Sequence, residues 1–146
     1  MTEPDPDWIA QRTEAARVQA DRLAQRQNAE HVKAEALLAE FLPVVLAHGP
    51  APEQLQVGGF DGRGQAKSNV RGWYLRKNHT VGLGIDGKFY ILSAPLSFKD
   101  RFRAVQITPT RPPLQLGKGG RDGEAMDLSE ALEQLFPNWR TFQQRS

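Results

Sequence analysis

Residues 71–94 constrain the fold more than any other part of this chain. They read RGWYLRKNHTVGLGIDGKFYILSA, in which three short runs of aromatic and branched residues are separated by polar pairs. Such runs are typical of β-strands, and Asp-Gly between apolar runs is typical of a tight hairpin turn. The segment therefore predicts three antiparallel strands, with turns at residues 78–79 and 86–87.

The spacing of the two turns predicts which strand residues face each other. A two-residue loop in the second turn would pair Gly84 with Phe89. Because side chains alternate across a sheet, Trp73 and Phe89 should share one face, above the strand glycines. Tyr74 and Tyr90 should share the other face. We expect the first pair in the core and the second pair exposed.

The rest of the chain predicts two helices and further short strands. Residues 8–28 have helical composition but few apolar positions, whereas residues 29–48 carry a stronger apolar pattern that Gly49-Pro50 ends. Residues 55–60, 103–108 and 114–116 are candidate strands. A second helix follows Asp127, which with Glu130 resembles a capping box.

These elements predict an α+β fold. We expect a projecting or weakly packed helical segment over residues 1–28 and a single α+β domain over residues 29–146. In that domain a long N-terminal helix and a C-terminal helix pack on a four- to five-stranded antiparallel sheet. A chain of 146 residues is long enough for one domain with a hydrophobic core.

Composition narrows the class of protein. The chain has no cysteine, which excludes disulfides and thiolate metal sites, and no apolar run has the length of a membrane helix. Its first residues, MTEPDPDW, lack the apolar stretch of a signal peptide. We therefore expect a cytoplasmic protein that is not bound to a membrane.

Charge is distributed unevenly along the chain. Residues 1–59 hold five Lys and Arg against nine Asp and Glu, and residues 60–121 hold twelve against three. A basic region of this kind is typical of proteins that bind nucleic acid or an acidic protein surface. The alternative is that these cations pair with the acidic helices of the same molecule.

Basic residues flank the aromatic residues of the predicted sheet, and a second basic group lies in a glycine-rich loop at residues 117–124. Cations can hold phosphates while exposed aromatic rings stack on bases. The predicted anion-binding residues are Arg71, Arg76, Lys77, Lys88, Lys118 and Arg121. Tyr74 and Tyr90 are the predicted stacking residues.

The loop at residues 117–124 supports a second hypothesis. Its glycine N–H groups precede a helix and could hold a phosphate or carboxylate together with Lys118 and Arg121. Asp122 or Glu124 could then serve as a base in a small enzyme. The alternative is an exposed loop in which Arg121 pairs with a neighbouring carboxylate.

Other motifs give no support to catalysis. Residues 82–87 fit G-x-G-x-x-G, but a strand follows them where a dinucleotide-binding fold requires a helix. The three histidines lack the spacing of a metal pair, and no serine lies in a nucleophile elbow. We expect no catalytic residue, metal or cofactor, and interpret the protein as a non-enzymatic binding module. A third hypothesis is an assembly protein that forms a homodimer through residues 8–28.

Two segments together support a resemblance. Residues 72–76 read GWYLR, and residues 117–124 read GKGGRDGE. In this the chain resembles a group of small uncharacterised bacterial proteins that combine a GWYLR strand with a GRGGRDGE-like loop. The resemblance would cover residues 30–135, and it implies no activity or partner.

Overall fold

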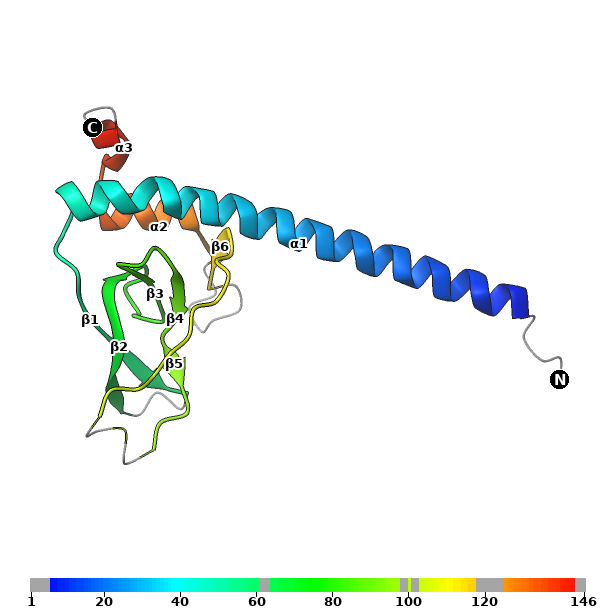
Figure 1. Cartoon of the computed structure of the whole chain (residues 1–146), viewed down its shortest axis with the longest axis horizontal. Coiled ribbons are helices and arrows are strands. Elements are labelled where there is room, and N and C mark those ends of the chain that lie inside the picture. The colour runs from blue at the N-terminus through cyan, green and yellow to red at the C-terminus, as the bar shows by residue number, and fades with distance from the viewer. Residues whose placement is uncertain (1–5, 61–63, 98–99, 101–102, 118–124, 144–146) are drawn as a thin grey trace.

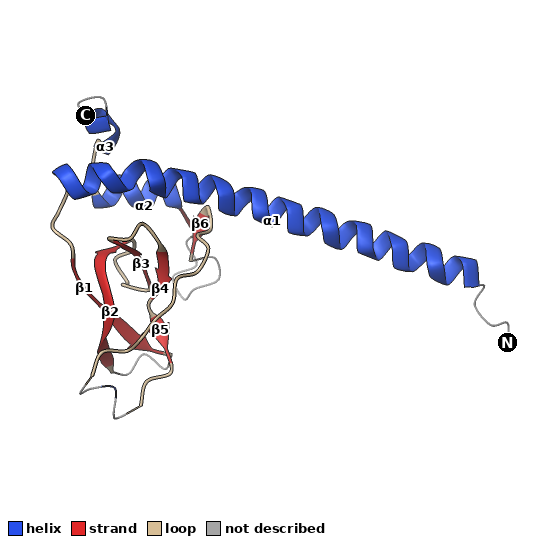
Figure 2. Cartoon of the chain, viewed as in Figure 1, coloured by secondary structure: helices blue, strands red, loops and turns tan. Residues whose placement is uncertain are grey.

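A computed structural model of the chain describes residues 6–60, 64–97, 100, 103–117 and 125–143. A long helix, a curled sheet and two short helices form the fold (Figure 1), and Figure 2 shows the same elements by type. The helices are α1 (Pro6–His48), α2 (Leu128–Leu135) and α3 (Trp139–Gln143). The strands are β1 (Glu53–Gly59), β2 (Gln65–Tyr74), β3 (Val81–Gly84), β4 (Phe89–Ile91), β5 (Ser93–Ala94), β6 (Gln115–Leu116) and β7 (Met126–Asp127). The predicted α+β class is confirmed.

The main sheet has five strands in the order β4-β3-β2-β1-β5. Only its β1–β5 pair is parallel among the strand pairs described. The two edge strands, β4 and β5, are separated in sequence by Leu92 alone. The Leu92 N–H donates to the Thr80 carbonyl (2.8 Å), and its carbonyl accepts from the Gly58 N–H (2.9 Å). One chain segment therefore runs along both edges, and the sheet curls back on itself.

The sheet register differs from the predicted one by one residue. Leu83 lies opposite Phe89 and Trp73 opposite Leu83, so the predicted pairing of Gly84 with Phe89 is wrong. The hairpin loop has three residues, and its Gly87 alone takes a positive φ of 82°. The carboxylate of Asp86 accepts the Lys88 N–H at 3.0 Å, and this side-chain turn replaces the predicted two-residue loop.

This register also moves the glycines to the other face of the sheet. A Cβ at Gly84 would lie 2.9 Å from the Tyr90 ring, and one at Gly82 would lie 3.1 Å from Leu92. The glycines therefore make room for the Tyr90 side of the sheet, and Leu83 joins Trp73 in the core instead.

Two hydrophobic clusters stabilise the fold. The larger one lies between the sheet and the helices, and it confirms that Trp73 and Phe89 are core residues. Its buried members are Ala34, Leu38, Phe41, Val44, Val45, Trp73, Leu75, Leu83, Phe89, Leu116, Leu128, Ala131, Leu132, Phe136 and Trp139. The smaller one fills the curl of the sheet with Leu55, Val70, Tyr90 and Leu92. Trp73 also donates its indole N–H to the Pro50 carbonyl at 2.7 Å.

Helix α1 is packed along only part of its length. Every residue from Pro6 to Glu30 is exposed, whereas five residues between Ala34 and Val45 are buried. Figure 1 shows the N-terminal part extending beyond the rest of the molecule. The helix continues without a break through residue 28 and through Pro43. Among the described residues, no helix is long and apolar enough to cross a membrane.

Residues 103–108 do not form the predicted strand. Val105 makes a single parallel bridge to Ser68 and exchanges main-chain hydrogen bonds with Lys67 (2.7 Å) and Asn69 (3.1 Å). The Ile107 N–H, which would continue the ladder, donates instead to the Asn69 side-chain oxygen at 2.9 Å. Because that bond goes to a side chain, the ladder ends after one bridge. The predicted strand at residues 114–116 is confirmed as β6.

The C-terminal helices close the larger cluster. Asp127 is the N-cap of α2 but makes no side-chain capping bond, so the predicted capping box is wrong. Asp127 is instead the last residue of β7, which pairs with β6. Trp139 packs edge-on against Phe41, with ring centroids 5.1 Å apart, and its neighbour Arg140 lies 3.6 Å from Glu40 of α1.

Candidate anion-binding groove

A groove of about 270 Å³ lies between the β2–β3 loop and helix α2. Its lining residues are Tyr74, Leu75, Arg76, Lys77, His79, Ala131, Gln134 and Leu135. Three of them were predicted as site residues: the stacking residue Tyr74 and the anion-binding residues Arg76 and Lys77. The fold thus brings part of the predicted site together beside a helix.

The β2–β3 loop is held by a compact set of hydrogen bonds. The Leu75 N–H donates to the Val81 carbonyl (2.9 Å), which closes the loop, and the His79 N–H donates to the Arg76 carbonyl (3.0 Å). Asn78 accepts the Thr80 hydroxyl at 2.7 Å. His79 takes a positive φ of 59°, as the predicted turn at residues 78–79 requires. The loop spans five residues rather than two.

Tyr74 and His79 form a stacked pair at the groove. Their ring centroids lie 3.8 Å apart, and their planes differ by 10°. The Tyr74 hydroxyl accepts the Gln56 N–H at 2.9 Å, which anchors the tyrosine to β1. His79 itself is an exposed residue. The sequence indicated a turn at His79 but gave no sign that its ring would cover Tyr74.

Arg76 connects the groove to β6. It is half-buried, and its Nη1 lies 3.4 Å from the Leu116 carbonyl. Gly117, with a positive φ of 74°, packs directly against the guanidinium, where a Cβ would collide with Nη1. Gly117 begins the predicted anion loop. The predicted residues Lys118 and Arg121 lie outside the described residues, so their role stays a prediction.

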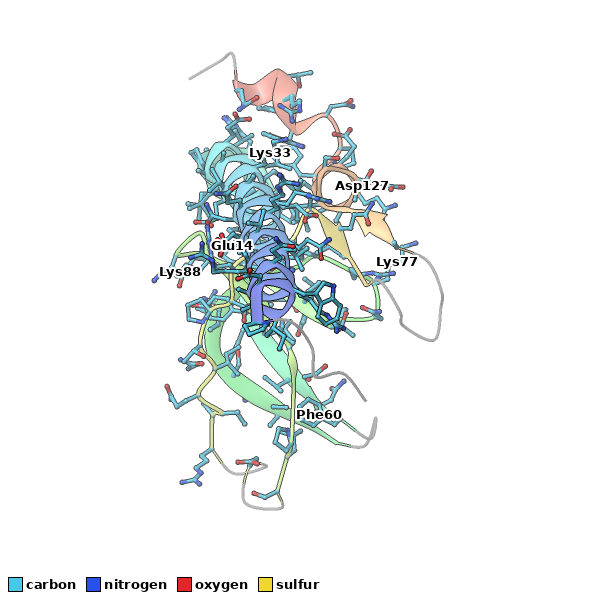
Figure 3. The ribbon with its side chains drawn as sticks, turned by 90° about the vertical axis from the view of Figure 1, so that its right-hand side faces the viewer. Glu14, Lys33, Phe60, Lys77, Lys88 and Asp127 are labelled. Atoms are coloured by element: carbon cyan, nitrogen blue, oxygen red, sulfur yellow. The ribbon has the colours of Figure 1, made fainter. Side chains whose placement is uncertain are left out.

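Lys77 and Lys88 lie on different sides of the molecule. Figure 3 shows their side chains projecting in opposite directions from the sheet. Both are exposed, and neither makes an ion pair within the part of the chain that the structure describes. The predicted cations that the structure describes therefore do not form one continuous face.

Arg71 and Tyr90 do not line the groove. Arg71 is exposed on β2 and donates to the Pro52 carbonyl at 3.2 Å. Tyr90 is only 5% exposed and donates its hydroxyl to Asp86 at 2.6 Å. Burial, followed by the hydrogen bond and charge of Asp86, raises the pKa of Tyr90 to about 12. The prediction that Tyr90 is an exposed stacking residue is wrong, because the curled sheet encloses its ring.

The alternative to a binding role was that basic residues pair with the acidic helices of the same molecule. Arg111 forms such a pair with α1. Its guanidinium donates twice to one Glu35 oxygen, at 2.9 and 2.7 Å, and once to Asn28 at 2.8 Å. No sequence pattern predicted this contact, since the residues are 76 and 83 positions apart.

The groups that line the groove are suited to contact an anion or a flat ring. Two cations, a stacked pair of rings and Gln134 line the groove together with the apolar residues Leu75, Ala131 and Leu135. Within the described ranges, no group of three His, Asp or Glu side chains is placed to hold a metal ion. No protein-family profile, curated protein or solved structure matches the chain.

Proposed function

We propose that this protein is a non-enzymatic, cytoplasmic binding module for an anionic partner, and that the partner is single-stranded nucleic acid. One observation carries the proposal: an exposed ring, His79, is stacked on Tyr74 beside two cations, Arg76 and Lys77. Proteins that bind single strands combine cations for the phosphates with aromatic rings for the bases.

The stacked pair favours nucleic acid over an acidic protein surface. A base could lie on the outer face of His79 and extend the existing Tyr74–His79 stack. Carboxylates of a protein would need the cations but would gain nothing from an exposed flat ring. Double-stranded DNA presents its bases inside the duplex, so the same ring favours single strands.

Fluorescence anisotropy with labelled single-stranded RNA and DNA of mixed sequence tests this function, at low and near-physiological salt. We expect binding that weakens with salt, because phosphate contacts release counterions. The variant Lys77→Glu should lose most of the affinity. Lys88→Glu is the matched control, since it makes the same charge change at an exposed site on the other side of the molecule (Figure 3).

Three results would refute the nucleic-acid function. One is no binding at low salt, and another is equal losses from Lys77→Glu and Lys88→Glu. The third is stronger competition by polyglutamate than by a single strand of equal charge, which would favour an acidic protein partner.

An assembly role is a second proposal, supported by the exposure of α1. Trp8 and Leu23 are each 53% exposed on the extended half of the helix, and the Arg12 guanidinium lies 5.4 Å from the centroid of the Trp8 ring. A second copy that pairs through residues 8–28 would cover such positions. Sedimentation of the full chain and of a chain lacking residues 1–28 tests it: a dimer that becomes a monomer supports pairing, and a full-length monomer excludes it.

A further inference from the structure

A second cavity, of about 360 Å³, lies on the Lys88 side of the molecule. It is bounded by three segments: α1 at Glu35 and Leu38, the β3–β4 turn at residues 87–89, and the strap, which we define as residues 109–112. Its volume is within the usual range for a small-molecule site, about 300–1,000 Å³. None of the residues of the anion-binding groove lines it.

The inner wall of this cavity is apolar and firmly held. Leu38 is 1% exposed and Phe89 is 3% exposed, and both belong to the larger hydrophobic cluster. Pro112 is buried and Pro109 completes the wall from the strap. Leu38 and Phe89 form the floor of the cavity but expose almost no surface, so a ring or a short hydrocarbon chain would lie against the exposed Pro109.

The strap is fixed against the helix and the sheet. The Thr110 N–H donates to the Phe89 carbonyl at 2.8 Å, and His31 of α1 hydrogen-bonds the Pro112 carbonyl at 2.8 Å. Arg111 donates to both Glu35 and Asn28. Because Thr110, Arg111 and Pro112 of the strap are all hydrogen-bonded to the sheet or to α1, the cavity is preformed, which lowers the entropy cost of binding.

The charges around the cavity favour an anion. Glu35 is neutralised by Arg111, so this pair adds no net charge. Lys88 remains as an exposed cation, and neither its ammonium group nor the Thr110 hydroxyl has a partner in the part of the chain that the structure describes. An ammonium and a hydroxyl beside an apolar wall suit one carboxylate attached to an apolar body.

We propose that this cavity binds a small organic carboxylate, with its apolar body against Pro109, above Leu38 and Phe89, and its carboxylate near Lys88 and Thr110. The site is separate from the proposed nucleic-acid function and does not depend on it.

The test is an NMR titration of ¹⁵N-labelled full-length protein with three probes: phenylacetate, acetate and 2-phenylethanol. We expect saturable shifts at Lys88, Phe89 and Thr110 with phenylacetate, and much weaker binding of the other two. Acetate lacks the apolar body, and phenylethanol lacks the charge. Lys88→Gln should weaken phenylacetate binding about fivefold, as the loss of one exposed ion pair would.

Two matched pairs of variants control the experiment. Lys77→Gln makes the same charge change outside the cavity and should leave phenylacetate binding unchanged. Thr110→Tyr should block the cavity, whereas Thr108→Tyr, at an exposed site that does not line it, should not. Equal shifts with acetate, shifts centred elsewhere, no saturable binding, or equal effects from either member of a pair would overturn the proposal.

Discussion

The His79 ring lies parallel to the Tyr74 ring at a centroid distance of 3.8 Å, and a left-handed backbone conformation at His79 holds it there. Two residues five positions apart thus make one aromatic surface at the end of a hairpin. The presence of this aromatic surface distinguishes the candidate groove from an ordinary polar loop.

The variant His79→Asn tests whether this ring contributes to binding. Asparagine tolerates a positive φ, so the turn should persist while the ring is lost. If a base stacks on His79, affinity for a single strand should fall about fivefold or more, since one stacked base contributes about 1–3 kcal/mol. His79→Tyr, which keeps a ring, should retain more affinity in the same anisotropy titration. Unchanged binding by His79→Asn would exclude stacking at this position.

Replacing Trp73 should destabilise the whole domain. Its side chain is 3% exposed and its indole N–H is bonded to Pro50, so Trp73→Ala leaves both a cavity and an unpaired carbonyl. We expect the free energy of unfolding in urea to fall by about 3–5 kcal/mol. Trp8→Ala, at an exposed position of the same chain, should change it by less than about 0.5 kcal/mol. Similar effects of the two substitutions would contradict the assignment of Trp73 to the hydrophobic core.

Tyr90 should make stability depend on alkaline pH. Its pKa rises from the ordinary value of 10.0 to about 12 on folding, so the folded state keeps the phenol protonated where the unfolded chain loses the proton. This contribution is complete below pH 10 and is lost as pH rises towards 12. Phenolate absorbance of a Tyr74→Phe protein isolates the titration of Tyr90.

Asp86→Asn distinguishes the causes of this shift. It removes the carboxylate charge beside the hydroxyl, so the pKa of Tyr90 should fall, though burial should keep it above 10.0. A value unchanged by this substitution would show that Asp86 does not hold the hydroxyl as the structure places it.

Arg111 should control how firmly the strap is held. Arg111→Ala removes three hydrogen bonds to α1, and because the pair is half-exposed we expect a cost of about 0.5–1 kcal/mol. Hydrogen exchange at the Thr110 amide should become faster. Arg17→Ala removes an ion pair with Glu14 on the extended helix and should leave Thr110 exchange unchanged. Equal exchange rates of the Thr110 amide in the two variants would show that the contacts of Arg111 with α1 do not hold the strap.

Local patterns in the sequence predicted the elements of this fold but not their register. Trp73 and Phe89 lie in the core because alternation of large apolar residues decides which face of a strand is buried. The number of loop residues between Gly84 and Lys88 depended on something else, namely whether the Asp86 carboxylate accepts the Lys88 N–H or Asp86 adopts a positive φ. Both geometries suit Asp-Gly, so the pattern could not select between them.

The candidate site was predictable only where its residues are close in sequence. Tyr74 is the last residue of β2, and Arg76 and Lys77 lie in the loop that follows it, so their clustering follows directly from the hairpin. The prediction that Tyr90 is exposed was wrong because the sheet curls around its ring. The curl depends on hydrogen bonds of Leu92 to two other segments of the chain, at Thr80 and Gly58. Contacts such as that of Arg111 with Glu35 depend on the packed tertiary structure and leave no local signal.

Because α1 is continuous, it fixes the distance and the orientation between its N-terminal end and the rest of the domain. A partner that grips the helix at Trp8 would be held roughly 35 Å from His31, where the strap fastens the helix, at 1.5 Å per residue. It would also be held at a fixed angle around the helix axis. Inserting one alanine near residue 20 would turn that partner by about 100° relative to the sheet, whereas inserting seven would nearly restore its orientation and move it about 10 Å outward. The extended helix therefore sets a rotational phase as well as a reach.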